Sequence, residues 1–65
     1  MITKSILAML EMEDIYDYYW EIMDTLSGGH YDKAREMFTQ MSTDQKIRFF
    51  DWQEATYFYE AEDNK

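Results

Sequence analysis

The sequence has no cysteine, no proline and only one histidine. Without cysteine there can be no disulfide, no thiolate nucleophile and no thiolate metal ligand. The histidine, His30, follows two glycines, so it is not part of the Glu-x-x-His pairs that hold two metal ions in helical bundles. The chain also has no glycine-rich phosphate loop and no EF-hand loop. These absences predict a non-enzymatic protein that needs no cofactor and no metal ion.

The chain also lacks a long apolar run. The short run over residues 6–10 is followed at once by Glu11. It is far below the roughly 20 apolar residues that a membrane-spanning helix needs, and no small-residue cleavage site of a signal peptide follows it. We therefore expect a cytoplasmic protein that does not enter a membrane.

Glycine occurs only at Gly28 and Gly29, which leaves one strong helix breaker in the chain. Apolar residues recur at helical spacing on both sides of it. Ser42 followed by Gln45 is a capping-box pattern, which predicts that another helix begins there. The sequence thus predicts an all-α, small three-helix bundle. Its single domain covers residues 1–65, with helices over about 3–26, 31–41 and 43–61. Leu7 and Leu10 lie off the apolar arc of the first helix, which predicts either a kink near residues 10–13 or a separate turn of helix over the first ten residues.

Residues 29–34 read Gly-His-Tyr-Asp-Lys-Ala. They resemble the Gly-x-Tyr-x-x-Ala that opens the second helix of a tetratricopeptide repeat. Because one such repeat cannot form a core by itself, the resemblance implies only a helical hairpin around the two glycines.

The third predicted helix carries two apolar strips. One strip, which we expect to face the core, contains Ile47, Phe50, Tyr57, Phe58 and Ala61. The other contains Trp52, Ala55 and Tyr59. One helix of a small bundle rarely needs two, so the second strip indicates either a loosely packed helix with half-exposed aromatic rings or a surface for a partner or a homodimer. The candidate docking residues are Phe49, Trp52 and Tyr59.

Charge is segregated along the chain. No basic residue lies between Lys4 and Lys33, and the net charge is −5 over residues 1–27, +1 over residues 28–48 and −4 over residues 49–65, which sums to −8. On a continuous first helix, six acids would share an arc of about 160° with Tyr18 and Thr25. Like charges three or four residues apart destabilise a helix by about 0.2–0.5 kcal/mol per pair, so this arrangement costs stability unless a partner compensates it.

Two kinds of function fit these features, besides acidity that serves solubility alone. In the first, the acidic face imitates a nucleic-acid backbone and occupies the basic groove of a DNA- or RNA-handling protein. The composition is similar to that of small phage-encoded inhibitors of CRISPR effectors, restriction enzymes or DNA-repair enzymes. The partner would then be a basic protein surface, without direct binding of nucleic acid. The candidate binding residues are Glu11, Glu13, Asp14, Asp17, Tyr18, Glu21 and Asp24.

The alternative function is a helical interaction or dimerisation module. It would dock through the aromatic residues named above or through Trp20, with the acids at the rim of the interface. The two functions differ in their response to salt. Groove mimicry weakens steeply as the salt concentration rises, whereas apolar docking does not.

Overall fold

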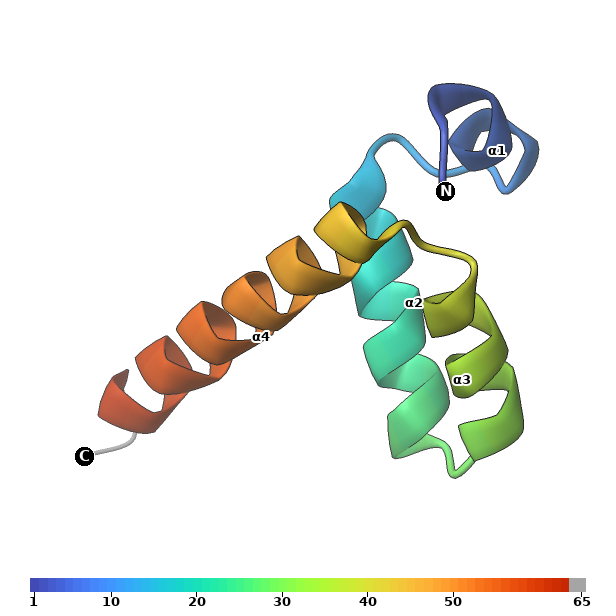
Figure 1. Ribbon diagram of the computed structural model, residues 1–65. Helices are drawn as coiled ribbons and strands as arrows, with labels where there is room; N and C mark the ends of the chain where they lie inside the picture. The colour runs from blue at the N-terminus through green and yellow to red at the C-terminus, as the bar shows by residue number, and fades with distance from the viewer. Residues whose placement is uncertain (64–65) are drawn as a thin grey trace.

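The computed structural model describes the backbone of residues 1–63 and the side chains of residues 1–56. It is all-helical, as the sequence predicts. The described part forms four helices, which are α1 (Lys4–Met9), α2 (Ile15–Ser27), α3 (Tyr31–Thr39) and α4 (Thr43–Asp63) (Figure 1). The last three form the core of the fold, and α1 is a short additional helix near the N-terminus.

The region predicted as a first helix over residues 3–26 consists of two helices, and the separate N-terminal turn is the predicted alternative that is present, because the chain leaves the helical path after α1. Glu11 has a φ of 60°, in the left-handed region. The Glu11 N–H donates to the carbonyl of Ala8 at 3.1 Å, and the Met12 N–H donates to the carbonyl of Leu7 at 2.9 Å. These two bonds form a Schellman motif, which satisfies the last carbonyl groups of α1 and ends it.

The start of α2 is fixed by two acids. The Asp14 carboxylate accepts hydrogen bonds from the backbone N–H groups of Tyr16 and Asp17, at 3.0 and 3.2 Å. In return, the Asp17 carboxylate accepts from the Glu13 N–H at 2.9 Å. Asp14 is thus the N-cap of α2, and the predicted kink near residues 10–13 is a complete break between two helices.

The hairpin predicted around the glycines is present, and α2 and α3 lie side by side (Figure 1). Gly29 has a φ of 81°, which a residue with a side chain adopts only at a cost. The His30 N–H donates to the carbonyl of Thr25 at 3.0 Å, so a second Schellman motif ends α2.

The capping box predicted at the start of α4 is also present. The Ser42 hydroxyl accepts from the Gln45 N–H at 3.2 Å, and the Gln45 side-chain carbonyl accepts from the Ser42 N–H at 3.0 Å. The same Gln45 amide group also accepts from the Ile2 N–H at 2.9 Å and donates to the Ile2 carbonyl at 2.7 Å. One side chain therefore caps α4 and holds the N-terminal segment against it.

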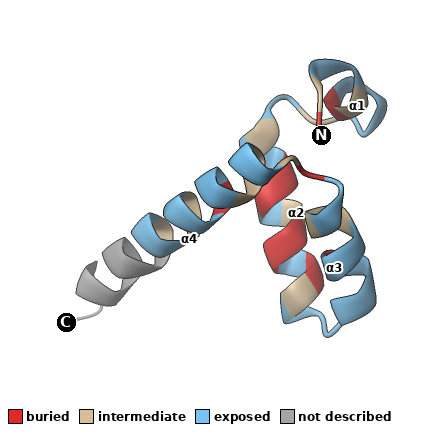
Figure 2. Cartoon of the chain, in the orientation of Figure 1, coloured by how far each residue is buried: buried red, intermediate tan, exposed pale blue. Residues whose placement is uncertain are grey.

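The core is small, and α4 joins it through the first half of its length (Figure 2). The buried apolar residues are Ile2, Leu7, Tyr18, Tyr19, Ile22, Met23, Ala34, Met41 and Phe49. Beyond its first turns, α4 diverges from the α2–α3 hairpin (Figure 1). None of the helices in the described part of the chain is both long enough and apolar enough to cross a membrane.

Over the described side chains of α4, the strip predicted to face the core is exposed, whereas the second strip is mixed, since its Ala55 is exposed. Phe49 is buried, with 3% of its surface exposed, and Trp52 is half-buried beside it. Ile47 and Phe50, which the sequence places toward the core, are 56% and 54% exposed. The remaining strip residues from Tyr57 onward lie outside the described side chains.

Candidate protein-binding surfaces

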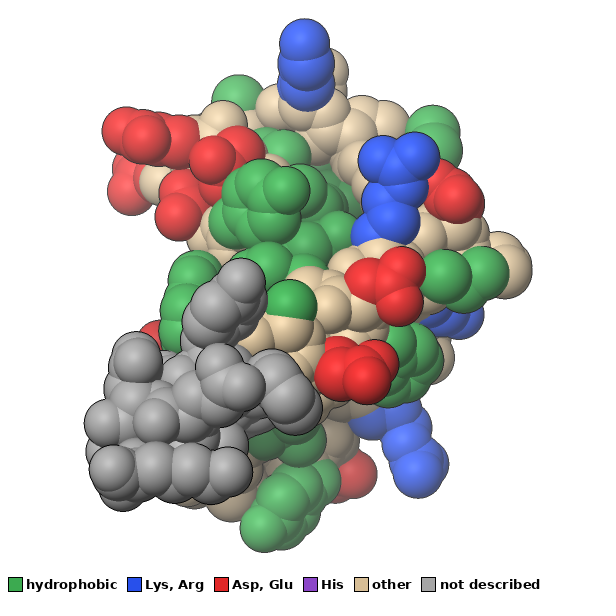
Figure 3. Space-filling view, turned by 90° about the vertical axis from the view of Figure 1, so that its left-hand side faces the viewer, with side chains coloured by type: hydrophobic (Ala, Val, Ile, Leu, Met, Phe, Trp, Pro, Cys, Tyr) green, Lys and Arg blue, Asp and Glu red, His purple; other side chains and the backbone are tan. Residues whose placement is uncertain are grey.

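The predicted acidic face is present in part. Four of its carboxylates, on Glu11, Glu13, Asp14 and Asp17, are exposed around the connection between α1 and α2, and Asp24 is exposed near the end of α2. We call these five residues the acidic patch. Glu21 is half-buried at its edge. Figure 3 shows one group of carboxylates at the upper left, apart from the Lys and Arg side chains, and further carboxylates on the right that lie near them.

Tyr18 does not belong to this surface, and its prediction as a partner-binding residue is wrong. Only 2% of its surface is exposed. Its hydroxyl donates a hydrogen bond to the carbonyl of Met37 on α3, at 2.6 Å. Burial raises the pKa of Tyr18 above its ordinary value of 10.0. Thr25, the other residue that accompanied the acids, is also buried. The predicted acidic arc therefore includes part of the contact with α3.

On α2 the solvent-facing strip is narrower than the predicted arc. At 100° per residue, Asp17, Glu21 and Asp24 lie within about 60° of one another. Tyr16 and Trp20 adjoin them, and both are exposed. The Trp20 ring contacts the Trp52 ring edge-to-face, with centroids 5.0 Å apart. The strip thus has an acidic side and an aromatic side.

Few bases compensate the acids. Within the part of the chain whose side chains are described, one ion pair forms, between Arg48 and Asp44 of α4 at 3.0 Å. No carboxylate of the acidic patch is paired with a base in that part. Asp14 and Asp17 have a second role as capping residues, so their charge also offsets the partial positive charge at the start of α2. Glu13 and Asp24 have no such role, since their side chains make no hydrogen bond among the described residues.

The three residues predicted to form an aromatic docking surface, Phe49, Trp52 and Tyr59, do not form an exposed surface over the described side chains. Phe49 is in the core, where its ring centroid lies 5.2 Å from that of Tyr19. Trp52 packs against Tyr19 and Trp20. Tyr59 lies outside the described side chains. Burial and the nearby Tyr16 raise the pKa of Tyr19, against the opposing charge of Arg48.

The buried side of α4 is the side that carries its capping residue, which the structure shows and the sequence does not. The capping residue Gln45 faces inward, toward Ile2. Phe49 and Trp52 follow it at steps of four and three residues, so they share its side of the helix. The side that points to solvent then contains Ile47 and Phe50, as observed.

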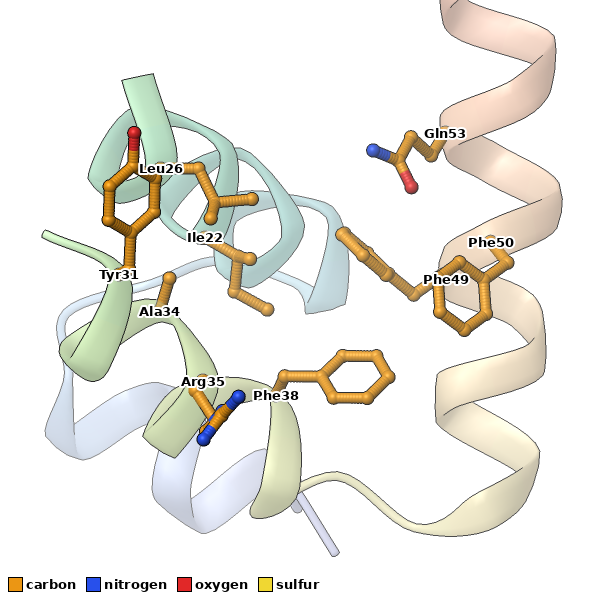
Figure 4. A pocket seen from close by; sticks show the side chains of 9 residues that line it. All are labelled: Ile22, Leu26, Tyr31, Ala34, Arg35, Phe38, Phe49, Phe50 and Gln53. Atoms are coloured by element: carbon orange, nitrogen blue, oxygen red, sulfur yellow. The ribbon is translucent and has the colours of Figure 1, made fainter. Parts of the chain in front are cut away.

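Phe50 lines an apolar groove of about 400 Å³ between α2, α3 and α4. In Figure 4, Phe38 from α3 and Phe49 from α4 point into the space between the helices. Arg35 lies at the groove, and the Lys46 ammonium lies 5.4 Å from the centre of the Phe38 ring. The groove is lined by Ile22, Leu26, Tyr31, Ala34, Arg35, Phe38, Phe49, Phe50 and Gln53.

No protein-family model, curated protein or solved structure matches this chain. Among the described residues, no group of three or more His, Asp or Glu side chains lies close enough together to hold a metal ion.

Proposed function

We propose that the protein is a non-enzymatic inhibitor that places its acidic patch in the basic nucleic-acid groove of a DNA- or RNA-handling protein. The observation that carries this proposal is a set of exposed carboxylates with no basic partner within the described side chains. Within the acidic patch, Glu13 and Asp24 give the strongest support, because neither side chain caps a helix or makes a hydrogen bond among the described residues that would explain its charge.

The spacing of the acids suits a groove that binds phosphates. Asp17, Glu21 and Asp24 follow one another at four and three residues, which places a carboxylate about every 5 Å along α2. A DNA strand carries one phosphate about every 3.4 Å along the duplex axis. The density of negative charge is therefore comparable, and Lys and Arg side chains that bind phosphates could bind these carboxylates instead.

Electrostatics also favours such a partner kinetically. The acidic patch and the total charge of −8 attract a basic surface over a distance of about one Debye length. Binding would supply the countercharges that the chain itself lacks, and it would relieve the repulsion between neighbouring carboxylates. Direct binding to DNA or RNA is disfavoured for the same electrostatic reason.

A charge-reversed variant tests this function, provided that it spares the helix caps. Asp17→Lys would remove a capping carboxylate as well as a charge. We therefore choose Glu13→Lys combined with Asp24→Lys. The matched control is Glu36→Lys combined with Asp51→Lys, at exposed positions outside the patch. Each pair of substitutions changes the net charge by +4, from −8 to −4. The two variants therefore have the same net charge and differ only in whether the substituted residues belong to the acidic patch.

The experiment is affinity capture on the immobilised protein from a bacterial lysate treated with nuclease. We expect the wild type and the control variant to retain proteins that duplex DNA releases, and that salt releases between about 50 and 200 mM. The patch variant should lose them. Retention that resists both DNA and salt, or that is the same on the patch variant, would contradict groove mimicry and favour docking through apolar residues.

A further inference from the structure

We infer that the apolar groove binds α4 of a second copy of this chain, with the two α4 helices antiparallel about a two-fold axis near Phe50. The inference concerns a surface other than the acidic patch, so it does not depend on the proposed inhibition. In such a symmetric pair each copy would fill the groove of the other.

The groove has the shape of an incomplete bundle. The α2–α3 hairpin and the first half of α4 form its walls, and α4 then diverges from the hairpin (Figures 1 and 4). A four-helix bundle places another helix against such walls. A helix of a second copy would thus complete the packing that one copy leaves open.

Exposed apolar side chains lie where this contact would form. Ile47 and Phe50 are three residues apart on one side of α4, and more than half of each is exposed. The Phe50 ring already packs beside Phe38 and Phe49, with centroid distances of 5.5 and 5.8 Å. Phe50 of a second copy would extend this aromatic cluster and remove apolar surface from water.

Charge complementarity identifies the occupant as α4 and sets its direction. Residues 28–48, which include the groove residue Arg35 and the adjacent Lys46, carry a net charge of +1, whereas residues 49–65 carry −4. In an antiparallel pair, the acidic half of each α4 lies over the basic part of the other copy. A parallel pair would instead place the two acidic halves together, which costs free energy.

The first test is sedimentation equilibrium of the full chain from low to high micromolar concentration. We expect a reversible dimer whose dissociation constant rises at least about tenfold in Phe50→Ser, since a central apolar anchor is lost. The matched control is Met9→Ser, which removes a side chain that is 82% exposed on α1, away from the groove. Circular dichroism should show the same helix content in all three proteins.

The second test fixes the direction of the helices. Because the chain has no cysteine, a single introduced thiol reports one contact. When Ile47→Cys and Glu54→Cys chains are mixed and oxidised, an antiparallel pair centred near Phe50 gives mostly the mixed disulfide. Disulfides between identical positions would overturn the arrangement. A wild type that stays monomeric, or a dimer that Phe50→Ser does not weaken, would overturn the assignment of the groove.

Discussion

Replacing Gln45 by Ala should destabilise the fold more than any loss of a helix cap alone. The Gln45 side chain makes three hydrogen bonds, to the Ile2 N–H, the Ile2 carbonyl and the Ser42 N–H, at 2.9, 2.7 and 3.0 Å. It joins residues 43 positions apart in the sequence. With alanine, the first turn of α4 loses one partner and the N-terminal segment loses both bonds to the start of α4.

The magnitude follows from the number of bonds. A hydrogen bond within a protein contributes a net of about 0.5–1.5 kcal/mol, so three of them contribute about 3 kcal/mol. These groups are partly exposed, and water can replace some of the lost bonds, which lowers the expected change to about 2 kcal/mol. A domain of this size has a total stability of roughly 3–10 kcal/mol. Gln45→Ala should therefore lower the melting temperature by about 10 °C or more.

Urea denaturation followed by circular dichroism measures the change, with two variants for comparison. Ser42→Ala removes the cap bond to the Gln45 N–H, at a cost of about 1 kcal/mol, and leaves the bonds to Ile2 in place. Gln45→Glu keeps the acceptor oxygens and loses the donor to the Ile2 carbonyl, so its stability should be intermediate. A Gln45→Ala variant that is no less stable than Ser42→Ala would show that the bonds to Ile2 do not stabilise the fold, contrary to this prediction.

Two further predictions concern single residues in and beside the predicted acidic face. Because burial raises the pKa of Tyr18, the stability that its protonated hydroxyl contributes is complete below pH 10.0 and is lost as the pH rises through the higher pKa of the folded state. In melting experiments at different pH values, Tyr18→Phe should therefore lose less stability at alkaline pH than the wild type. Near neutral pH the same variant should be less stable by about 1 kcal/mol, because the hydrogen bond to the Met37 carbonyl is lost. Glu11→Gly should stabilise the fold by about 1 kcal/mol, because glycine adopts the φ of 60° without strain; a lower melting temperature would show that the Glu11 side chain contributes more than the strain costs.

Features that depend on a few neighbouring residues could be predicted from the sequence. The capping box from Ser42 to Gln45 and the turn at Gly29 involve local hydrogen bonds and backbone preferences, and both are present. The break between α1 and α2 could also have been detected, since Asp14 is a good N-cap residue. From the sequence alone, the charge of Asp14 is instead assigned to the acidic face, and the residue is not considered as a helix cap. The left-handed Glu11 gives no such signal, because the residue type does not favour that conformation.

Features that depend on packing could not be predicted in the same way. The periodicity of α2 gives a wide apolar arc, but it does not show that the arc extends to Tyr18, whose hydroxyl is satisfied only by a carbonyl on α3. In α4, two strips compete for the core, and the outcome depends on the rings of Tyr19 and Trp20 that the hairpin presents to Phe49 and Trp52. Which residues of a helix are buried therefore depends on the side chains of the neighbouring helices, and the sequence of that helix alone does not determine it.

The proposed function requires that the acidic patch and a nucleic acid compete for the same groove of the partner. The most direct measurement takes a protein captured as described above, purifies it, and follows its binding to the immobilised chain while duplex DNA is added. We expect DNA to displace it completely, and the Glu13→Lys, Asp24→Lys variant not to bind it. A ternary complex, in which the captured protein holds DNA and this chain at the same time, would contradict the claim.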